Sequence, residues 1–255
     1  MTATIHHGDA LDVLRSLPDA SVDAVVTDPP YCSGSVSEAS RTAAKGQGLR
    51  SENISRFGWF VGDNMGTAGL SWLLRSMAVE ALRVVKPSAS MLVFCDWRML
   101  SSLQPAIESA GWRSQNVIVW DKGSMGLGAG FRCQHELIMH FTAGAPEYHD
   151  RATGNVITVP RVDSDEREHQ TQKPIDLMRR LVRVVAPVGG VVLDPFAGSG
   201  TTIAAALMEG RSGIGVERSL EYVEIARTRC ANVEAGNPPA PRILAQKVLD
   251  FGAAS

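Results

Sequence analysis

The stretch VDAVVTDPPY, residues 22–31, joins an expected buried strand to a rigid turn. Its first six residues are β-branched and mostly apolar, which is typical of a buried strand. The strand ends before the two prolines, because proline cannot donate to a sheet ladder. Both prolines also fix φ, so the tetrapeptide Asp28-Pro29-Pro30-Tyr31 forms a stiff platform of acceptors beside an aromatic face. This platform suits a planar ligand with an exocyclic amine, although Asp-Pro is also ordinary turn chemistry.

A second stretch, VVLDPFAGSGTT at residues 191–202, pairs another short apolar run with a glycine-rich turn. An apolar helical pattern follows at residues 203–208. A strand, a glycine-rich turn and a helix start together favour a nucleotide-type cofactor. Glycines let the backbone approach the ligand, and the helix N-terminus offers free N–H groups. No lysine follows the second glycine, so the turn is not a P-loop, and the third glycine of the dinucleotide fingerprint is missing.

Alternating strand and helix patterns in the rest of the chain predict a mostly parallel sheet covered on both faces. Amphipathic spacing is clearest at residues 71–85, where we expect Trp72, Leu73, Met77 and Ala78 on one apolar face. The other expected helices cover residues 10–17, 99–110, 173–185 and 220–230. The expected strands cover residues 3–9, 22–28, 91–95, 112–120, 136–141, 191–193 and 212–216.

The DPPY motif at residues 28–31 and the FAGSG turn at residues 196–200 together resemble the amino-methyltransferases of DNA, which use S-adenosyl-methionine. In that family DPPY is the catalytic motif, and the Phe-x-Gly-x-Gly turn binds the methionine part of the cofactor. Here the catalytic motif comes first, as in the permuted β group. Members of that group often carry HPTQKP before the cofactor turn, and HQTQKP at residues 169–174 departs from it only at Gln170.

This resemblance runs from about residue 5 to residue 230 and covers most of the chain. It implies a Rossmann-like α/β methyltransferase fold with a mostly parallel seven-stranded sheet, helices on both faces and a circularly permuted motif order. It also implies the site residues. The catalytic residues are Asp28, Pro29, Pro30 and Tyr31. The expected cofactor contacts are Asp9, Asp28, Lys173, Asp194, Phe196, Ala197, Gly198, Ser199, Gly200, Thr201 and Glu217.

Three of these residues have structural alternatives. Asp9 is expected to reach the adenine of the cofactor, or else to cap the following helix. Lys173 either meets the cofactor carboxylate or caps a neighbour. Glu217 lies about twenty residues beyond the glycine turn at a strand end, a position suited to accepting both ribose hydroxyls, and its alternative is again a helix cap.

The acidic residues of the predicted site all follow expected strands. Parallel strands end at the same edge of a sheet, and ligands bind there. We therefore expect one cluster of acids at that edge, made of Asp9, Asp28, Asp194 and Glu217.

Basic residues in two loops are the candidates for DNA contact. Residues 32–66 are rich in Ser, Gly and Ala without a clear period, which predicts a long loop of the kind that is usually functional or mobile. The glycine-rich segment before residues 136–141 resembles the family segment along the target base. Expected DNA contacts are Arg41, Lys45, Arg50 and Arg56 in the first loop and Lys122 and Arg132 in the second. A merely solvated loop is the alternative for both.

The family's target-recognition region is expected at residues 142–168, where it is short and ends in an acidic cluster. Acidic side chains are unfavourable on a surface that binds phosphates. Either the loop at residues 32–66 makes most of the DNA contact or a partner subunit contributes. Permuted members are often dimers, so a homodimer is one expectation.

Length and composition fit a single methyltransferase domain over residues 1–255. No run approaches the ~20 apolar residues of a membrane span, and the N-terminus has no signal-peptide pattern, so we expect no membrane contact and a cytoplasmic location. The four cysteines have no paired spacing, which argues against a disulfide framework or a zinc site, and we expect no metal. With a net charge of −2, DNA affinity requires local clusters of Lys and Arg.

The expected reaction is methyl transfer from S-adenosyl-methionine to an exocyclic amine of double-stranded DNA. Hydrogen bonds to the Asp28 carboxylate and the Pro29 carbonyl would localise the amine lone pair toward the methyl group. The base must leave the duplex, with Tyr31 as its stacking face. Family members with Asp first in the motif mostly act on adenine N6, and those with Ser first mostly act on cytosine N4. Asp28 therefore favours adenine, and the alternatives are cytosine N4, an RNA or protein amide, and an inactive DNA-binding homologue.

Overall fold

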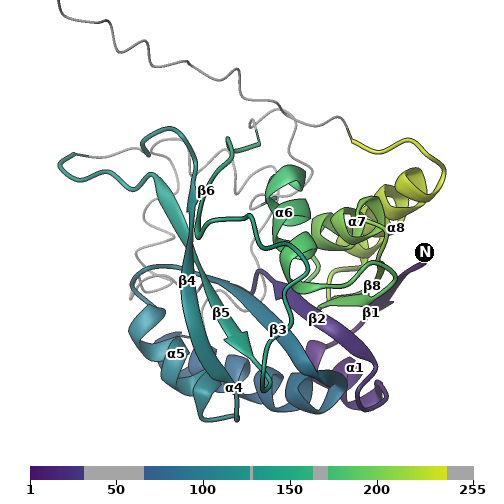
Figure 1. Cartoon of the computed structure of the whole chain (residues 1–255), viewed down its shortest axis with the longest axis horizontal. Coiled ribbons are helices and arrows are strands. Elements are labelled where there is room, and N and C mark those ends of the chain that lie inside the picture. The colour runs from purple at the N-terminus through teal and green to yellow at the C-terminus, as the bar shows by residue number, and fades with distance from the viewer. Residues whose placement is uncertain (32–65, 127–128, 163–171, 240–255) are drawn as a thin grey trace, which may run out of the picture.

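The computed structural model describes residues 1–31, 66–126, 129–162 and 172–239 (Figure 1). The helices are α1 Ala10–Ser16, α4 Gly66–Val84, α5 Leu100–Glu108, α6 Ile175–Val185, α7 Thr201–Met208 and α8 Leu220–Glu234. The strands are β1 Ala3–His7, β2 Val22–Thr27, β3 Val85–Cys95, β4 Arg113–Asp121, β5 His135–Thr142, β6 Val156–Thr158, β7 Val191–Asp194 and β8 Ser212–Glu217. In these described residues no helix is both long and apolar enough to cross a membrane.

The strands form one eight-stranded sheet in the order β1-β8-β7-β2-β3-β5-β4-β6. Among the described strands only β5 runs against the others, pairing antiparallel with β3 and β4. The predicted α/β fold with a mostly parallel sheet is confirmed, but the predicted count of seven strands is wrong. The additional strand is β6, whose three residues pair with β4. A three-residue strand is too short to show a period-2 pattern.

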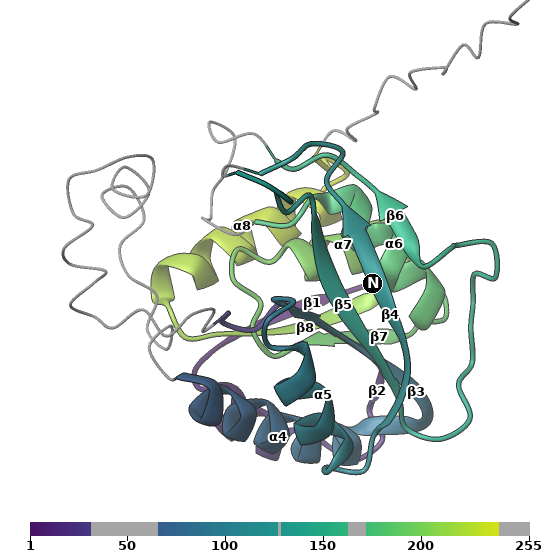
Figure 2. The ribbon, with the colours of Figure 1, turned by 90° about the vertical axis from the view of Figure 1, so that its left-hand side faces the viewer.

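Helices cover both faces of the sheet, as predicted. Figure 2 shows α6, α7 and α8 on one side of the sheet and α4 and α5 on the other. Successive residues of β3 point to opposite faces, so Met91 and Val93 pack with the α1, α4 and α5 residues, and Leu92 and Phe94 pack with those of α6. This double burial explains why the central strands are continuous apolar runs.

Helix α4 begins at Gly66, five residues earlier than predicted. Its buried face consists of Leu70, Leu74, Met77, Ala78, Ala81 and Val84. The expectation that Trp72 belongs to the apolar face is wrong, because its side chain is 63% exposed. The helix turns its Leu70–Leu74 row toward the sheet, which rotates Trp72 outward.

Candidate active site

Four acidic side chains lie at the carboxyl edge formed by the parallel neighbours β1, β8, β7 and β2. Asp194 and Glu217 are the last residues of β7 and β8. Asp28 directly follows β2, and Asp9 follows β1 after one glycine. The expected gathering of these acids is confirmed, because the four strands end side by side.

The turn after β7 depends on two glycines in the left-handed region. Gly198 has φ 50° and Gly200 has φ 78°. Gly200 is the N-cap of α7, and a Cβ there would lie 2.7 Å from the Cβ of Ala226 in α8. A side chain at this position would therefore be strained in φ and would collide with α8. The predicted arrangement of strand, glycine turn and helix start is confirmed.

Glu217 fastens the glycine turn to the start of α8. Its Oε2 accepts a hydrogen bond from the Gly198 N–H at 2.9 Å, and its Oε1 accepts one from the Ser219 N–H at 2.7 Å. Ser219 is the N-cap residue of α8, so Glu217 does serve a helix start. Each carboxylate oxygen has a second lone pair, so ribose hydroxyls can still be accepted. The ribose contact remains a prediction.

Asp194 is buried between the two sequence motifs and is only 1% exposed. Its Oδ1 accepts hydrogen bonds from Thr27 Oγ1 at 2.7 Å and from the Phe196 N–H at 3.1 Å. Thr27 ends β2 immediately before the catalytic motif, so Asp194 joins that motif to the glycine turn. Burial raises the pKa of Asp194 to about 6, although its hydrogen bonds act in the opposite direction. Its predicted contact with the cofactor remains a prediction.

The remaining predicted cofactor residues are held by α8 and by helix caps. Arg229 of α8 donates to Ser199 Oγ at 3.0 Å and to Thr201 Oγ1 at 2.6 Å. The Ala197 N–H donates to the carbonyl of Val216 in β8 at 2.9 Å. Asp9 caps α1, since its Oδ1 accepts from the Leu11 N–H at 2.9 Å. The structural alternative for Asp9 is therefore observed, and its contact with the cofactor remains a prediction.

Asp28 and Lys173 form a buried ion pair. The Nζ of Lys173 lies 2.5 Å from Oδ2 of Asp28, and the lysine side chain is 6% exposed. The ammonium also lies over the rings of Phe94 and Tyr31, at 5.0 and 5.1 Å from the ring centroids. Such contacts stabilise a cation that has lost its water. Neither sequence alternative for Lys173 anticipated this contact with the catalytic motif.

Glu136, the second residue of β5, connects the remaining groups. Its Oε2 accepts from the Tyr31 hydroxyl at 3.1 Å and lies 3.3 Å from Lys173 Nζ. Its Oε1 lies 2.7 Å from Lys122 Nζ, which follows β4. Charges thus alternate along Asp28, Lys173, Glu136 and Lys122, which we call the charge cluster.

Sequence reasoning missed Glu136 because the direction of β5 is not visible in the sequence. An antiparallel strand begins at the edge where its parallel neighbours end. Glu136 therefore lies beside Asp28 although it stands at the start of its own strand. The sequence feature that could have indicated Glu136 is an acidic residue directly before an apolar strand.

Burial and neighbouring charges shift the pKa values of this cluster. Burial raises the pKa of Asp28, and the charge of Lys173 offsets this only in part. Burial also acts to raise the pKa of Glu136, but Lys173 and Lys122 outweigh it and lower that pKa. For Lys173 burial acts downward, yet the two carboxylates raise its pKa. Burial, followed by the same two carboxylates, raises the pKa of Tyr31 well above 10.0. Glu136 is thus a carboxylate, Lys173 an ammonium and Tyr31 a neutral phenol at neutral pH.

One oxygen of Asp28 is left open in this arrangement. Its Oδ1 is buried and accepts no hydrogen bond from the described residues. Buried acceptors in proteins nearly always have a donor. This oxygen lies beside Lys173 and at the edge where parallel sheets bind ligands, so it is suited to a donor group on a substrate.

The predicted DNA contacts divide into three groups. Arg41, Lys45, Arg50 and Arg56 lie outside the described residues. Lys122 belongs to the charge cluster and its side chain is 14% exposed, so it does not lie on the open surface. Arg132 is exposed, between β4 and β5. Contact of any of these residues with DNA remains a prediction, as does target recognition by residues 142–168.

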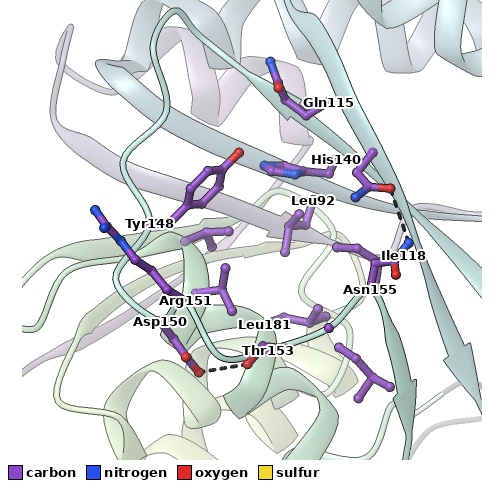
Figure 3. A pocket seen from close by; sticks show the side chains of 15 residues that line it. Leu92, Gln115, Ile118, His140, Tyr148, Asp150, Arg151, Thr153, Asn155 and Leu181 are labelled. Carbon is purple, nitrogen blue, oxygen red and sulfur yellow. Dashed lines mark hydrogen bonds between the residues drawn. The ribbon is translucent and has the colours of Figure 1, made fainter.

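A separate pocket of about 470 Å³ lies between the sheet and the C-terminal half of α6 (Figure 3). Its lining includes the apolar residues Leu92, Ile118 and Leu181, and the His140 and Tyr148 rings meet there edge to face at 5.8 Å. His140 lies near the end of antiparallel β5, toward the opposite edge from Glu136. None of the residues lining this pocket is a predicted catalytic or cofactor residue, but several, among them Tyr148, Asp150 and Arg151, belong to the predicted target-recognition segment 142–168.

Comparison with known proteins identifies the class to which this fold and site belong. A family model described as DNA methylase matches residues 22–228. The putative methylase YubD of Escherichia coli K12 is 30% identical over 227 residues, covering 89% of each chain. The DNA adenine methyltransferase YhdJ of the same organism is 29% identical, covering 89% of this chain and 82% of its own.

Solved structures show the same fold. The putative DNA modification methylase TTHA0409 of Thermus thermophilus, in complex with S-adenosyl-methionine, is 25% identical with a TM-score of 0.65, covering 91% of this chain and 94% of its own. The cytosine-N4-specific PvuII DNA methyltransferase is 18% identical with a TM-score of 0.68, covering 89% and 86%. The chain belongs to the N6/N4 DNA methylase family. It is a DNA methyltransferase, and its cofactor is S-adenosyl-methionine.

Proposed function

We propose that this DNA methyltransferase methylates the N6 amine of an adenine flipped out of double-stranded DNA. Two observations support adenine. The catalytic motif begins with Asp28, the residue typical of adenine-specific members. The relative YhdJ is named a DNA adenine methyltransferase. The PvuII enzyme shares the fold but acts on cytosine N4, so cytosine is the second candidate.

The observation that carries this proposal is the open oxygen of Asp28. Oδ2 is held by Lys173 at 2.5 Å, whereas Oδ1 is buried and accepts no hydrogen bond from the described residues. An exocyclic amine has two N–H donors, and one of them satisfies Oδ1. The second donor is available to the carbonyl of Pro29. These two hydrogen bonds direct the nitrogen lone pair out of the plane of the base, where it can attack a methyl group.

The residues at the glycine turn fit the cofactor. Gly200 leaves no space for a Cβ beside α8, so the turn needs a glycine where it packs against that helix. The N-terminus of α7 favours a carboxylate, and Glu217 at the end of β8 favours hydroxyls. When bound, S-adenosyl-methionine would supply a methyl group whose bond to sulfur breaks as the bond to nitrogen forms, and the amine proton that is lost would pass to its hydrogen-bond acceptor, Oδ1 of Asp28, and from there to water. The chain contributes alignment of amine and methyl group, which accounts for much of the acceleration.

Tyr31 is the proposed stacking face for the flipped base. Its hydroxyl is tied to Glu136, and Lys173 lies over the ring at 5.1 Å from the centroid. These contacts fix the plane of the ring before any substrate arrives. A base stacked on a fixed ring loses less freedom on binding, because the protein side is already ordered.

The deciding experiment is nucleoside analysis of the reaction product. The purified chain is incubated with S-adenosyl-methionine and unmethylated genomic DNA, and the DNA is digested and analysed by mass spectrometry. N6-methyladenine is the expected product. N4-methylcytosine would overturn the base assignment and leave the family intact. Absence of both products, from protein that binds the cofactor, would support an inactive homologue or a different substrate.

A further inference from the structure

Glu136 contacts three side chains around the catalytic motif, Tyr31, Lys173 and Lys122. Both of its oxygens are used, Oε2 by Tyr31 and Lys173 and Oε1 by Lys122. The three partners come from separate segments of the chain: the turn after β2, the residue after β4 and the residue before the N-cap of α6. Glu136 is therefore the point at which these segments meet beside Asp28.

Asp28 and Glu136 are neighbouring acceptors for the same donor groups, those of Lys173 and Tyr31. A lysine ammonium has three donors, and a tyrosine hydroxyl has one. Lys173 directs one donor to Asp28 Oδ2 and a second toward Glu136, while the Tyr31 hydroxyl donates to Glu136. Without the Glu136 carboxylate, the neighbouring acceptor for both groups is Asp28. Its Oδ1 would then be covered by Lys173 or Tyr31.

We propose that Glu136 is a positioning residue of the methyl-transfer site, which accepts the Tyr31 hydroxyl and one donor of Lys173 and so keeps Oδ1 of Asp28 open for the substrate amine. Lys122 completes the arrangement by neutralising the charge of Glu136 from the other side. The inference rests on the proposed role of Asp28 in amine binding. It does not depend on whether the amine belongs to adenine or to cytosine.

The first test compares Glu136→Gln with the matched surface control Glu108→Gln. Glu108 is exposed at the end of α5, away from the cluster. We expect Glu136→Gln to lower the single-turnover methylation rate by about 10- to 100-fold, as a misplaced catalytic group does. Cofactor affinity, measured by calorimetry, should stay within about twofold, because Glu136 does not touch the glycine turn. The control should match the wild type in both measurements.

A pH profile separates positioning from a merely structural role. The charged and titratable groups that face Asp28 are Lys173, Glu136, Tyr31 and Asp194. Glu136 acts to raise the pKa of Asp28, and it shares Lys173 with it. In Glu136→Gln, Asp28 is the only carboxylate of the pair that remains beside Lys173, so the pKa of Asp28 should fall. The acidic limb of the rate profile should then move to lower pH. Glu136→Asp, which restores the charge, should move that limb back toward the wild-type position.

A direct titration keeps the test independent of activity. The side-chain carboxyl carbon of Asp28 is followed by NMR in protein labelled with ¹³C aspartate, and its signal is identified by its loss in Asp28→Asn. The Asp28 titration should shift to lower pH in Glu136→Gln. If Glu136→Gln does not fold, Glu136→Gln with Lys122→Gln replaces the ion pair by a neutral pair, and the same shift is expected.

Three outcomes would overturn the inference. These are an unchanged rate with an unchanged titration of Asp28, a loss of cofactor binding, and an equal effect in Glu108→Gln. They differ from failure of the proposed function, which appears as a different methylated nucleoside from the wild-type enzyme. For a wild-type chain without turnover, the NMR titration would still measure the effect of Glu136 on the pKa of Asp28.

Discussion

The carboxyl edge of the sheet holds its acids in two different ways. On the cofactor side, Asp194 and Glu217 accept hydrogen bonds from backbone N–H groups and from a hydroxyl. On the catalytic side, Asp28 and Glu136 are held by the ammonium groups of Lys173 and Lys122. Both sides lie on the same edge, but in the described residues the acids of the catalytic side are paired with ammonium groups, whereas those of the cofactor side accept from backbone N–H groups and a hydroxyl.

This difference agrees with the different functions of the two sides, cofactor binding and methyl transfer. Backbone groups have fixed positions, so a turn that they hold keeps one shape, which suits binding of a constant cofactor. Lysine side chains are long and their charges stabilise neighbouring carboxylates, so they control how strongly Asp28 attracts a donor. We therefore expect substitutions on the catalytic side to affect the methyl-transfer rate and substitutions on the cofactor side to affect binding and shape.

The largest effect is expected for Asp28→Asn. The variant removes the charge of the proposed acceptor, and loss of a group that acts directly on a reacting proton lowers a rate by about 10²- to 10⁴-fold. Single-turnover methylation measures this loss, and calorimetry with S-adenosyl-methionine should show nearly normal binding. The exposed Asp12, on α1, provides the matched control Asp12→Asn. Complete loss of cofactor binding in Asp28→Asn would assign Asp28 to the cofactor side instead.

Lys173→Met tests the ion pairs that distinguish the catalytic side. The variant removes the ammonium group that lies between the Asp28 and Glu136 carboxylates, so these two acids become neighbours without a cation between them. Removing one partner of a buried ion pair destabilises a protein by about 3–5 kcal/mol. Urea unfolding at pH 7 should show this loss, and it should shrink at lower pH as the unpaired carboxyls become protonated. A loss of less than about 1 kcal/mol, the range of exposed pairs, would show that the cluster is hydrated and weak.

Gly200→Ala tests the backbone geometry of the cofactor side. A left-handed φ costs a non-glycine residue roughly 1–2 kcal/mol, and an overpacked contact adds about 1–3 kcal/mol. The contact is the 2.7 Å approach to the Cβ of Ala226. We expect a stability loss of about 2–5 kcal/mol and weaker cofactor binding, while the pH profile of the remaining activity stays unchanged. Gly236 also has a positive φ, but a Cβ added there would meet open space. The stability loss of Gly236→Ala therefore measures backbone strain without the collision.

The sequence predicted the cofactor side better than the catalytic side. The DPPY motif, the glycine turn and the four acidic strand ends are all visible in local patterns. Parallel strands bring them together because such strands end at the same edge of the sheet, where ligands bind. The lysine contacts depend on the direction of β5 and on the path of the chain before α6, which local patterns do not contain. For the same reason the sequence predicts Lys122 as a DNA contact but does not show its ion pair with Glu136.

Two errors in the fold prediction have a similar origin. Strand β6 has three residues, and among the described strands it pairs with β4 alone, so no periodic pattern could indicate it. The spacing of apolar residues places Trp72 on the apolar face, but packing of Leu70 and Leu74 against the sheet decides the orientation of α4. In both cases tertiary contacts, which the local sequence does not show, override the local pattern.

The smallest effect is expected for Asp194→Asn, which probes the buried acid that joins the two sides. The asparagine oxygen can still accept from Thr27 and from the Phe196 N–H, so the geometry should persist. Burial raises the pKa of Asp194 to about 6 in the folded protein, above its ordinary value of 3.8. The folded state therefore binds more protons than the unfolded state between these two values, and this group makes the wild type less stable as pH rises through that window.

The variant lacks this titration, so its stability relative to the wild type should increase by up to about 2–3 kcal/mol between pH 4 and pH 7. Urea unfolding of both proteins at these two pH values measures the difference, and other titrating groups cancel in the comparison. A constant difference would show that the pKa of Asp194 is the same in the folded and unfolded protein and that its hydrogen bonds fully offset its burial. In that case the cofactor side, like the catalytic side, would hold a true carboxylate at the edge of the sheet.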